Sequence, residues 1–489
     1  MIRADSIGRD IVGKVKGFFI RRRGRGASSR LILGEITALW CQANRPASWA
    51  LAKPYEKTGG WQEEKEPEYE ILDFPSGKKY IESFFLYSTL AKRFNRRGAN
   101  MALNFDLTEE QNLTRQAVRD FAEKEIALLA DELDEKEEFS VAITKKMGEL
   151  GLLGCFVPEK YGGSNMGYIA YIIAVEELAR VDGSQAATIA AGNSLGIGPV
   201  YYFGNEKQKK EWLPKLCAGK MLAAFGLTEP NAGSDAGGSQ TRAELHGDQW
   251  VINGSKIFIT NSANPLTGVV IVQAITGMKE DGKRELSCLL VPKDAPGFTA
   301  REMKKKMMWR ASNTGELFFE DCVVPRENLL GQKGDGFHQM LSTLDGGRLS
   351  IGAMGLGGAQ GAFEMALHYA NTRVQFGRSI GSFQVNAFKL ADMALEIELA
   401  RNLLYKACWL REKNRPFSKE AAMAKLYCSE VMYRCVNHAV QLHGGYGLMK
   451  EYKIERFYRD QKLLEIGEGT SEIQRIVIAR NIGVAGRAL

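Results

Sequence analysis

The sequence predicts an α+β chain of several domains, in which a helical segment, a β-rich segment and a second helical segment follow one another. Apolar residues recur at helical spacing from residue 101 to about 221 and again from about 333 onwards. Between about 222 and 330 they follow the spacing of strands instead. The 489 residues suffice for about two to four domains with a large core.

The first hundred residues differ from the rest in charge. They hold 19 Lys and Arg against 11 Asp and Glu, so they account for the whole net charge of +7 and the remainder is nearly neutral. A nucleic-acid-binding role for the remainder therefore has no electrostatic support. We expect residues 1–100 to be a poorly ordered N-terminal extension, with Met101 as the alternative natural start. A tail that touches a membrane or RNA stays open.

Residues 101–221 are predicted to form an N-terminal helical domain. Thr108 with Gln111 fits a capping box at the start of a helix. Ile172 to Arg180 and the stretch after Asn205 resume the helical pattern.

Residues 222–332 are predicted to form a middle β-domain. Asn253-Gly254 lies between two β-rich arms within Trp250–Thr260, which predicts a hairpin. Further strands are expected at Val269–Val272, Leu289–Val291 and Glu316–Phe319.

Residues 333–489 are predicted to form a C-terminal helical bundle domain. One helix carries an apolar series with helical spacing that we expect to be buried, formed by Phe388, Ala391, Leu395, Leu399 and Leu403. A second helix runs from about Ser418 to Leu442 and ends at Gly444-Gly445, because glycine is a common helix stop.

The composition also excludes several classes of protein. No run of about 18 apolar residues is present, so no membrane span is expected. The eight cysteines are scattered and the five histidines are dispersed, so we expect buried thiols in a reducing compartment and no metal site.

A glycine-flanked acid near the end of the chain is the best candidate for a catalytic group. Glu468 lies between Gly467 and Gly469, and Ser471 with Gln474 fits a capping box for the helix that follows. A carboxylate at such a turn can be aimed into a pocket, which suits a general base. The alternative is a solvated loop acid.

Four other segments are individually weak signals of a binding site. The Leu227–Asp235 segment places hydroxyls beside a glycine turn, and Phe258 with Thr260 alternates along a strand. Such a pair can pack on a flat ring and bond its edge, although a core Phe with a surface Thr is the commoner arrangement. Arg373–Gly377 with Gln384, and Gln441–Gly445, complete the set.

These segments, in this order and ending in Glu468-Gly469-Thr470, resemble the acyl-CoA dehydrogenase family over residues 101–489, with Trp309–Ser312 as a further match. The resemblance implies an acyl-CoA dehydrogenase-like fold, with a helical domain, a β-domain and a four-helix bundle. It implies FAD as cofactor and a homotetramer built as a dimer of dimers, in which the neighbouring subunit completes the FAD site. The compartment would be the cytoplasm of a bacterium, which we favour, or the mitochondrial matrix of a eukaryote.

The resemblance also implies site residues. Those expected to contact FAD within the β-domain are Phe225, Leu227, Thr228, Gly233, Ser234, Phe258, Ile259 and Thr260. Those expected to hold the FAD of the partner subunit are Arg373, Phe376, Gln384, Gln441, Leu442, His443, Gly444 and Gly445, with Thr470, Ser471 and Glu472 near its diphosphate and ribose. Those expected to line the acyl-CoA are Ser234, Asp345, Gly346, Gly347, Arg348 and Gly469.

The same resemblance makes Glu468 the catalytic base. Some members carry the base just before the arginine equivalent to Arg348, where this chain has Gly347, which cannot act. Gly467 stands where many members have tyrosine, so a branched, cyclic or aromatic acyl group is a hypothesis to test. Phe258 and Met308 replace a frequent tryptophan and a frequent glycine, and nothing in the sequence explains Met308.

The implied reaction is α,β-dehydrogenation of an acyl-CoA to a 2-enoyl-CoA, with the α-proton taken by Glu468 and the β-hydride by flavin N5. The thioester carbonyl would accept hydrogen bonds from the FAD ribityl hydroxyl and the Glu468 amide. Electron-transfer flavoprotein is the expected acceptor. An acyl-CoA oxidase, an enoyl-CoA reductase working in reverse and a catalytically silent acyl-CoA-binding flavoprotein stay open.

Overall fold

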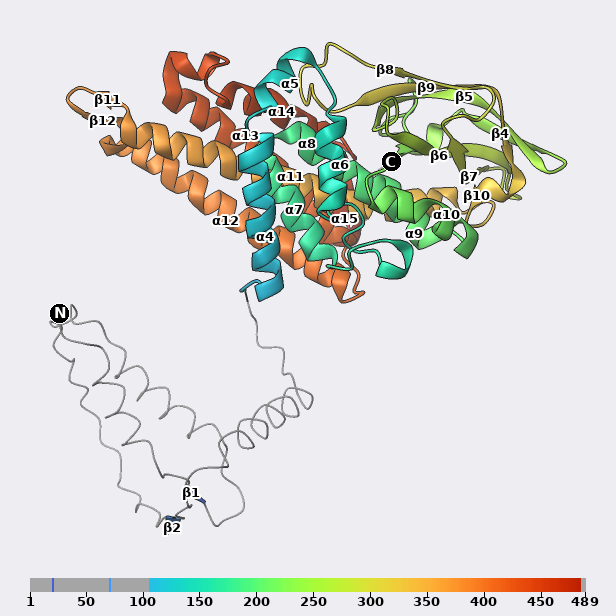
Figure 1. The fold of residues 1–489 in the computed structure, drawn as a ribbon, viewed down its shortest axis with the longest axis horizontal. Helices are drawn as coiled ribbons and strands as arrows, with labels where there is room; N and C mark the ends of the chain where they lie inside the picture. Colours follow the sequence, from blue (N-terminus) through green and yellow to red (C-terminus); the bar gives the residue numbers. More distant parts are fainter. Residues whose placement is uncertain (1–19, 22–69, 72–104, 485–489) are drawn as a thin grey trace. The chain divides into compact units, whose positions relative to one another are not determined.

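A computed structural model describes residues 105–484 of the chain and two short strands outside that range (Figure 1). The strands β1 (Ile20–Arg21) and β2 (Glu70–Ile71) pair antiparallel within a first unit, Met1–Phe105. The second unit, Asp106–Leu489, contains everything that follows. The expectations for residues 1–100 therefore lie almost wholly outside the described residues.

The second unit opens with a helical layer. Its helices are α4 (Glu109–Phe121), α5 (Ala130–Lys136), α6 (Val141–Glu149), α7 (Tyr168–Ala179), α8 (Gly183–Ala191), α9 (Gly198–Phe203) and α10 (Glu206–Cys217). The predicted capping box is confirmed at α4, where Gln111 N donates to Thr108 Oγ1 at 3.2 Å and Thr108 N donates to Gln111 Oε1 at 3.0 Å. All 12 residues of α7 are buried, so this helix lies at the centre of the layer.

The β-domain is one mixed sheet. Its strand order is β10-β7-β6-β4-β5-β9-β8, and β3 pairs in parallel with β6. The strands are β3 (Leu222–Gly226), β4 (Arg242–His246), β5 (Gln249–Thr260), β6 (Thr267–Met278), β7 (Arg284–Pro292), β8 (Phe298–Glu302), β9 (Thr314–Pro325) and β10 (Leu329–Leu330). Side chains of β6 alternate between two cores: Val270 and Val272 belong to the core of the β-domain, whereas Val269 and Ile271 join the core shared with the helices.

The hairpin predicted at Asn253-Gly254 is wrong. Residues 249–260 form the single strand β5, and the turn lies earlier, at Gly247, which has a φ of +61°. Gly254 instead marks a register shift between β5 and β9, because the strand bulges there. Asn253 is used in the sheet: its side chain bonds both the side chain and the backbone N–H of Asp321, at 3.0 and 2.9 Å.

The chain then returns to helices. They are α11 (Gly336–Thr372), α12 (Gln384–Glu412), α13 (Ser418–His443), α14 (Ile454–Ile466) and α15 (Ser471–Asn481), with the hairpin β11 (Val374–Gln375) and β12 (Arg378–Ser379) between α11 and α12. The predicted glycine stop of α13 is confirmed, since Gly444 caps it with a φ of +59°. Figure 1 shows α11 reaching from the β-domain to the β11–β12 hairpin at the opposite end of this unit.

The expectation that one apolar series of α12 is buried is also wrong. Phe388 and Leu395 are 58% and 59% exposed, and Leu399 is likewise exposed. The buried face of the helix is a different set, Leu390, Met393, Ile397, Ala400, Leu404 and Ala407. Both faces of α12 are therefore apolar, and one of them has no partner among the residues that the structure describes.

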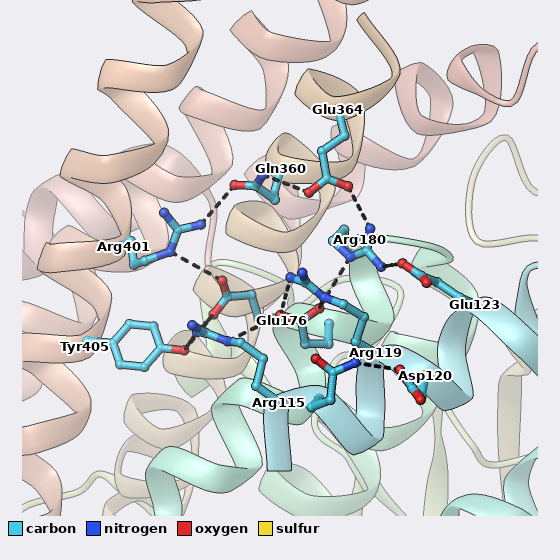
Figure 2. Close-up of polar contacts among 12 residues, drawn as sticks. Arg115, Arg119, Asp120, Glu123, Glu176, Arg180, Gln360, Glu364, Arg401 and Tyr405 are labelled. Carbon is cyan, nitrogen blue, oxygen red and sulfur yellow. Dashed lines mark hydrogen bonds and ion pairs between the residues drawn. The ribbon is translucent and has the colours of Figure 1, made fainter. Parts of the chain in front are cut away.

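Two adjacent acids of α7 join the two helical layers (Figure 2). Glu177 accepts hydrogen bonds from Arg119 of α4 at 2.8 and 3.0 Å, and it pairs with Arg115 at 3.3 Å. Glu176 accepts from Tyr405 of α12 at 2.6 Å. Both carboxylates are buried, so their charges are stabilised by these partners and not by water.

The network continues to α11. Arg180, at the end of α7, donates to Glu364 of α11 at 2.6 Å and also pairs with Glu177 and Glu123. Arg401 of α12 lies 3.5 Å from Glu176. A cavity of about 220 Å³ lies among these charged groups, so the contact between the layers is polar at this point and apolar elsewhere.

Replacing Glu177 by Gln should destabilise the protein by about 3 kcal/mol, because it removes the buried negative charge that Arg115, Arg119 and Arg180 share. Urea denaturation followed by circular dichroism would report the loss as a lower midpoint. Glu132→Gln, at an exposed pair with Lys136, is the matched control and should change stability by less than about 0.5 kcal/mol. Equal midpoints for the two variants would contradict the role given to Glu177.

Candidate active site

Glu468 lies on the short turn between α14 and α15. Gly467 N donates to Leu463 O at 2.7 Å and so ends α14. Glu468 then takes a φ of +52° and Gly469 a φ of +95°. A left-handed glutamate is a strained conformation, which is held only where the surroundings fix it and is frequent at functional sites.

The capping box predicted for Ser471 and Gln474 is wrong. Thr470 is the N-cap of α15, and its hydroxyl accepts from Ile473 N at 3.3 Å. The Gln474 side chain donates instead to Gly469 O at 2.9 Å and to Glu468 O at 3.3 Å. Gln474 thus stabilises the turn that presents Glu468, and it does not cap the helix.

The carboxyl group of Glu468 is poorly solvated. The residue as a whole is half-buried, but its Oε2 is buried and has no hydrogen-bond partner among the described residues. Burial raises the pKa of Glu468 to about 7, while the charges of Lys425 and Arg348 act to lower it. A carboxyl group with a pKa near neutrality can exchange its proton with a bound molecule under physiological conditions.

A glycine of α11 makes the room for this carboxyl. An ideal Cβ on Gly347 would overlap Glu468 Oε2, so residue 347 cannot carry a side chain while Glu468 keeps this position. The neighbouring Gly346 faces Arg411 in the same way, and its carbonyl accepts from Tyr168 Oη at 2.9 Å. The two base positions that the family resemblance presents as alternatives therefore occupy one space in this fold.

The same turn of α11 carries an ion pair between a buried arginine and a half-buried aspartate. Arg348 pairs with Asp345, and Asp345 also accepts from Ser418 Oγ at 3.0 Å. Burial lowers the pKa of Arg348 and raises that of Asp345, although each charge favours the other. Asp345 to Arg348 thus form a rigid, charged segment directly beside Glu468.

The β-domain contributes a loop and a bulge. Lys256 and Glu229, both buried, pair at 2.7 Å, and Glu229 also accepts from the backbone N–H groups of Gln240 and Thr241. This pair anchors the Leu227–Asp235 loop to β5, as does the 2.9 Å bond from Ile257 N to Thr228 O. Burial lowers the pKa of Lys256, and Glu229 opposes that effect.

An aromatic ring projects from β5 next to this loop. Phe258 has a φ of +62° at a register shift of the strand, and its side chain is 63% exposed. The remaining predicted residues of this group are divided by exposure: Phe225 and Ile259 are buried, Leu227 and Thr260 are half-buried, and Gly233 and Ser234 are exposed. The commoner reading of Phe258 as a core residue is therefore excluded.

The third group of predicted residues lies at the other end of the bundle. Arg373, Leu442, His443, Gly444 and Gly445 line a cavity of about 480 Å³. Phe376, at the tip of the β11–β12 hairpin, is 93% exposed. Figure 1 places this hairpin far from the β-domain, so one chain does not bring Phe258 and Phe376 together.

These surroundings fit a flavin dinucleotide. A Cβ added at Gly233, Gly444 or Gly445 would meet no atom within 4 Å, so a ligand can approach the backbone closely there. The exposed ring of Phe258 on the β-domain and that of Phe376 on the β11–β12 hairpin offer flat apolar surfaces, and Arg373 offers a cation at the start of the hairpin. Such a combination suits a molecule with two aromatic ends and a diphosphate.

The structure thus brings together Gly347, Glu468 and the Asp345–Arg348 pair, and it keeps the Arg373–Gln384 and Gln441–Gly445 segments apart from them. It also adds Lys425, whose charge acts on Glu468 and whose ammonium donates to Gly469 O at 2.8 Å. The sequence signal for Lys425 was a lysine on the otherwise apolar face of α13 that holds Ala421, Ala424 and Cys428.

Gly347→Ala should lower the rate of the reaction that uses Glu468 by at least about a hundredfold, because displacing a reacting group by about 1 Å has that effect. Gly352→Ala is the matched control in the same helix. A Cβ at residue 352 would lie 3.2 Å from Cδ1 of Leu404, the end of a side chain that can shift slightly. Little change in the rate is therefore expected. Stopped-flow measurement of flavin reduction, with circular dichroism for folding, would separate the two. A Gly347→Ala variant that reduces its flavin at the normal rate would show that Glu468 does not occupy the position found in the structure.

Three family models cover most of the chain. They are the N-terminal, middle and C-terminal domains of acyl-CoA dehydrogenase, matched at residues 108–220, 224–322 and 334–483. The described residues include no helix that is long and apolar enough to cross a membrane, and no cluster of His, Cys, Asp or Glu fit to hold a metal ion.

Relatives agree with these models. A protein of Bacillus subtilis named probable acyl-CoA dehydrogenase YngJ is 55% identical over 380 residues, which are 78% of this chain and 100% of that protein. A short-chain specific acyl-CoA dehydrogenase of Clostridium acetobutylicum is 45% identical, again over 78% and 100%. The solved butyryl-CoA dehydrogenase of Megasphaera elsdenii is 42% identical, with a TM-score of 0.75 and coverage of 78% and 100%. The chain therefore belongs to the acyl-CoA dehydrogenase family of FAD-dependent oxidoreductases that act on acyl-CoA.

Proposed function

We propose that the chain dehydrogenates a short, straight-chain acyl-CoA to the 2-enoyl-CoA, with Glu468 as the base that removes the α-proton. The observation that carries this proposal is the Glu468 carboxylate, whose Oε2 lies buried against the backbone of Gly347 and has no hydrogen-bond partner in the described part of the chain. A base in such a place needs little reorganisation to accept a proton from a bound thioester.

The pKa of Glu468 suits this role. The α-proton of a thioester is a weak acid, so the base must be ionised near neutral pH and yet basic enough to hold the proton afterwards. A carboxyl with a pKa of about 7 meets both conditions, whereas a solvated glutamate would be a weaker base. The Glu468 backbone N–H would stabilise the developing negative charge on the thioester oxygen.

The remaining residues would place the substrate. Asp345, Arg348 and Gly469 surround Glu468 and would line the acyl-CoA, and Ser234 would reach it from the exposed loop of the β-domain. The rigid Arg348–Asp345 pair supports this assignment, because a site that orients a substrate needs groups that are themselves fixed.

FAD would be held by two subunits. Thr228, Thr260, Phe258 and Ser234 would contact the flavin from the β-domain, while Arg373, Phe376, Gln384 and Gln441–Gly445 would hold it from the partner chain. The chemistry that bound FAD supplies is acceptance of the β-hydrogen as hydride. Support comes from the opposite positions of the β-domain and the β11–β12 hairpin in Figure 1, since one chain cannot place both at one cofactor.

The acyl group is proposed from the relatives. The printed names of the Clostridium and Megasphaera proteins specify short-chain and butyryl substrates. Gly467 leaves room for a larger group, although a Cβ there would already lie 3.3 Å from Leu463 O. A comparison of butyryl-CoA with isobutyryl-CoA, cyclohexanecarbonyl-CoA and 3-phenylpropanoyl-CoA, which all carry α- and β-hydrogens, decides between the straight and the bulky acyl group.

We further propose electron-transfer flavoprotein as the acceptor. A solved chain that is 43% identical, with a TM-score of 0.76, comes from work described as concerning the electron-transferring flavoprotein of Acidaminococcus fermentans. This likeness supports electron-transfer flavoprotein as the acceptor. The bacterial relatives support the cytoplasm as the compartment.

We also propose domain boundaries at 101–221, 222–332 and 333–489.

Glu468→Gln should retain FAD and lose at least about a hundredfold in the rate of flavin reduction, the usual minimum for loss of a general base. The test is an anaerobic titration of the yellow protein with butyryl-CoA. The unaltered protein should bleach, and the variant should bleach only very slowly. Glu430→Gln, an acid of α13 that pairs with Arg475 of α15 at 2.6 Å, tests whether any loss of an acid beside α15 has the same effect.

Near-normal bleaching of Glu468→Gln would overturn the assignment of the base. Bound flavin that no acyl-CoA bleaches would point to a reductase working in the opposite direction or to a silent binding protein. Rapid reoxidation by oxygen, without electron-transfer flavoprotein, would point to an oxidase.

The exposed face of α12 should hold the subunits together. We expect a homotetramer built as a dimer of dimers, and Phe388→Asp combined with Leu395→Asp should dissociate it, because the charges oppose burial of this face. Analytical ultracentrifugation would show the smaller species, with loss of FAD. Met278→Asp, on an equally exposed residue of the β-domain, is the control. An unaltered protein that is monomeric with FAD bound would contradict the proposal.

A further inference from the structure

Lys425 is a lysine that the fold buries completely. It lies on α13, its exposed fraction is 0%, and it is among the largest fully buried side chains of the described residues. Burying a charged ammonium costs several kcal/mol unless nearby groups compensate. The presence of a lysine at this position therefore needs an explanation, because an apolar residue could be buried there without that cost.

The side chain of Lys425 reaches the turn that carries Glu468. Its Nζ donates to Gly469 O at 2.8 Å. One helical turn further along α13, Ser429 Oγ donates to Leu464 O at 3.0 Å, at the end of α14. Two side chains on one face of α13 thus hold the turn from both sides, and Gln474 holds the same Gly469 carbonyl from α15.

A hydrogen bond to a neutral carbonyl does not require a cation. Glutamine could donate to Gly469 O at a lower desolvation cost, and Lys425 has no ion pair within 4.0 Å among the described residues. The acids whose charges act on Lys425 are Glu468, then Glu465 and Glu472, and Glu472 is exposed. The principal buried counter-charge available to the ammonium is thus the carboxylate of Glu468.

We propose that Lys425 is a positioning residue for the catalytic base: it fixes the Glu468–Gly469 turn through the Gly469 carbonyl, and its charge keeps the Glu468 carboxylate ionised until the substrate is bound. This inference rests on the proposed role of Glu468. In the step concerned, the α C–H bond of the acyl-CoA breaks, its proton passes to the Glu468 carboxylate, and its electron pair stays with the substrate.

The other charged and titratable groups around Glu468 do not replace Lys425. Arg348 of α11 also favours the ionised form, but Arg348 is already paired with Asp345. Tyr171 of α7 is uncharged, because burial raises its pKa well above the usual range. Burial lowers the pKa of Lys425 to about 8, and Glu468 opposes that effect, as expected for two groups that stabilise each other's charge.

The test uses the FAD-loaded protein and a 3-thia-acyl-CoA, in which sulfur replaces the β-carbon so that no hydride can leave. Exchange of the α-protons in D2O, followed by NMR over a range of pH, then reports the base alone. In the unaltered protein, exchange should rise with pH around a midpoint near the Glu468 pKa of about 7, because only the ionised carboxylate can accept a proton.

Two variants separate charge from hydrogen bonding. Lys425→Gln keeps a donor for Gly469 O and loses the charge, and Lys425→Met loses both. Loss of a nearby cation raises a carboxyl pKa, so both should move the midpoint upwards by about one pH unit or more, and Lys425→Met should also lower the plateau rate. Lys425→Arg should keep the midpoint of the unaltered protein. Lys462→Met, on the exposed side of α14, is the control for loss of a lysine.

A midpoint that stays in place in Lys425→Gln overturns the proposal, even if the plateau rate falls, because Lys425 would then be structural only. If Lys425→Met fails to bind FAD, Lys425→Gln and Lys425→Arg still decide the question. Absence of exchange in the unaltered protein, or exchange that persists in Glu468→Gln, would instead overturn the proposed role of Glu468 and this inference with it.

Discussion

The desolvated carboxylate of Glu468 is the constraint on which the site depends. Two helices and a turn are arranged so that this group lies against backbone instead of water: α11 supplies Gly347, α13 supplies Lys425, and the turn lies between α14 and α15. Each contribution fails if one of the others moves, because the left-handed backbone of Glu468 is held only by its surroundings. The high pKa of the carboxyl is a consequence of that packing.

A second constraint is electrostatic and acts over a longer range. The chain buries several charges, and most are neutralised in pairs, as in Lys256–Glu229, Arg456–Asp182 and Arg348–Asp345. Lys256–Glu229 and Arg456–Asp182 join a strand or a helix to a neighbouring loop or helix start, and Arg348–Asp345 lies within α11, so each pair fixes local geometry that apolar packing alone would leave adjustable. Lys425 and Glu468 differ from them, since they influence each other without a direct ion pair. Such a looser arrangement suits a carboxylate that has to gain and lose a proton.

The sequence predicted the order of domains and the main strands because these depend on local patterns. The role of Glu468 as the base rests on the family resemblance and stays a prediction. Period, capping residues and flanking glycines can be read over a few positions, as at Thr108 and Gly444. The wrong predictions concern positions whose structure depends on contacts with residues far away in the sequence. Asn253-Gly254 forms a bulge because β9 pairs alongside it, and the Phe388 face of α12 is exposed because Leu390 and its neighbours already fill the core. Lys425 was not predicted as a site residue, because Gly469, to which its ammonium donates, lies 44 residues away in the sequence.

The helix α11 joins two functional ends through 37 uninterrupted residues. It begins at the β-domain, carries Asp345 to Arg348 beside the base, and ends at the hairpin that bears Phe376. Each added or deleted residue would rotate everything beyond it by about 100° and shift it by about 1.5 Å. Substitutions at the exposed positions of α11 would be tolerated, but a one-residue insertion before Gly347 would turn a different face towards Glu468. The evolutionary record of this helix should therefore contain changes of side chain and almost no changes of length.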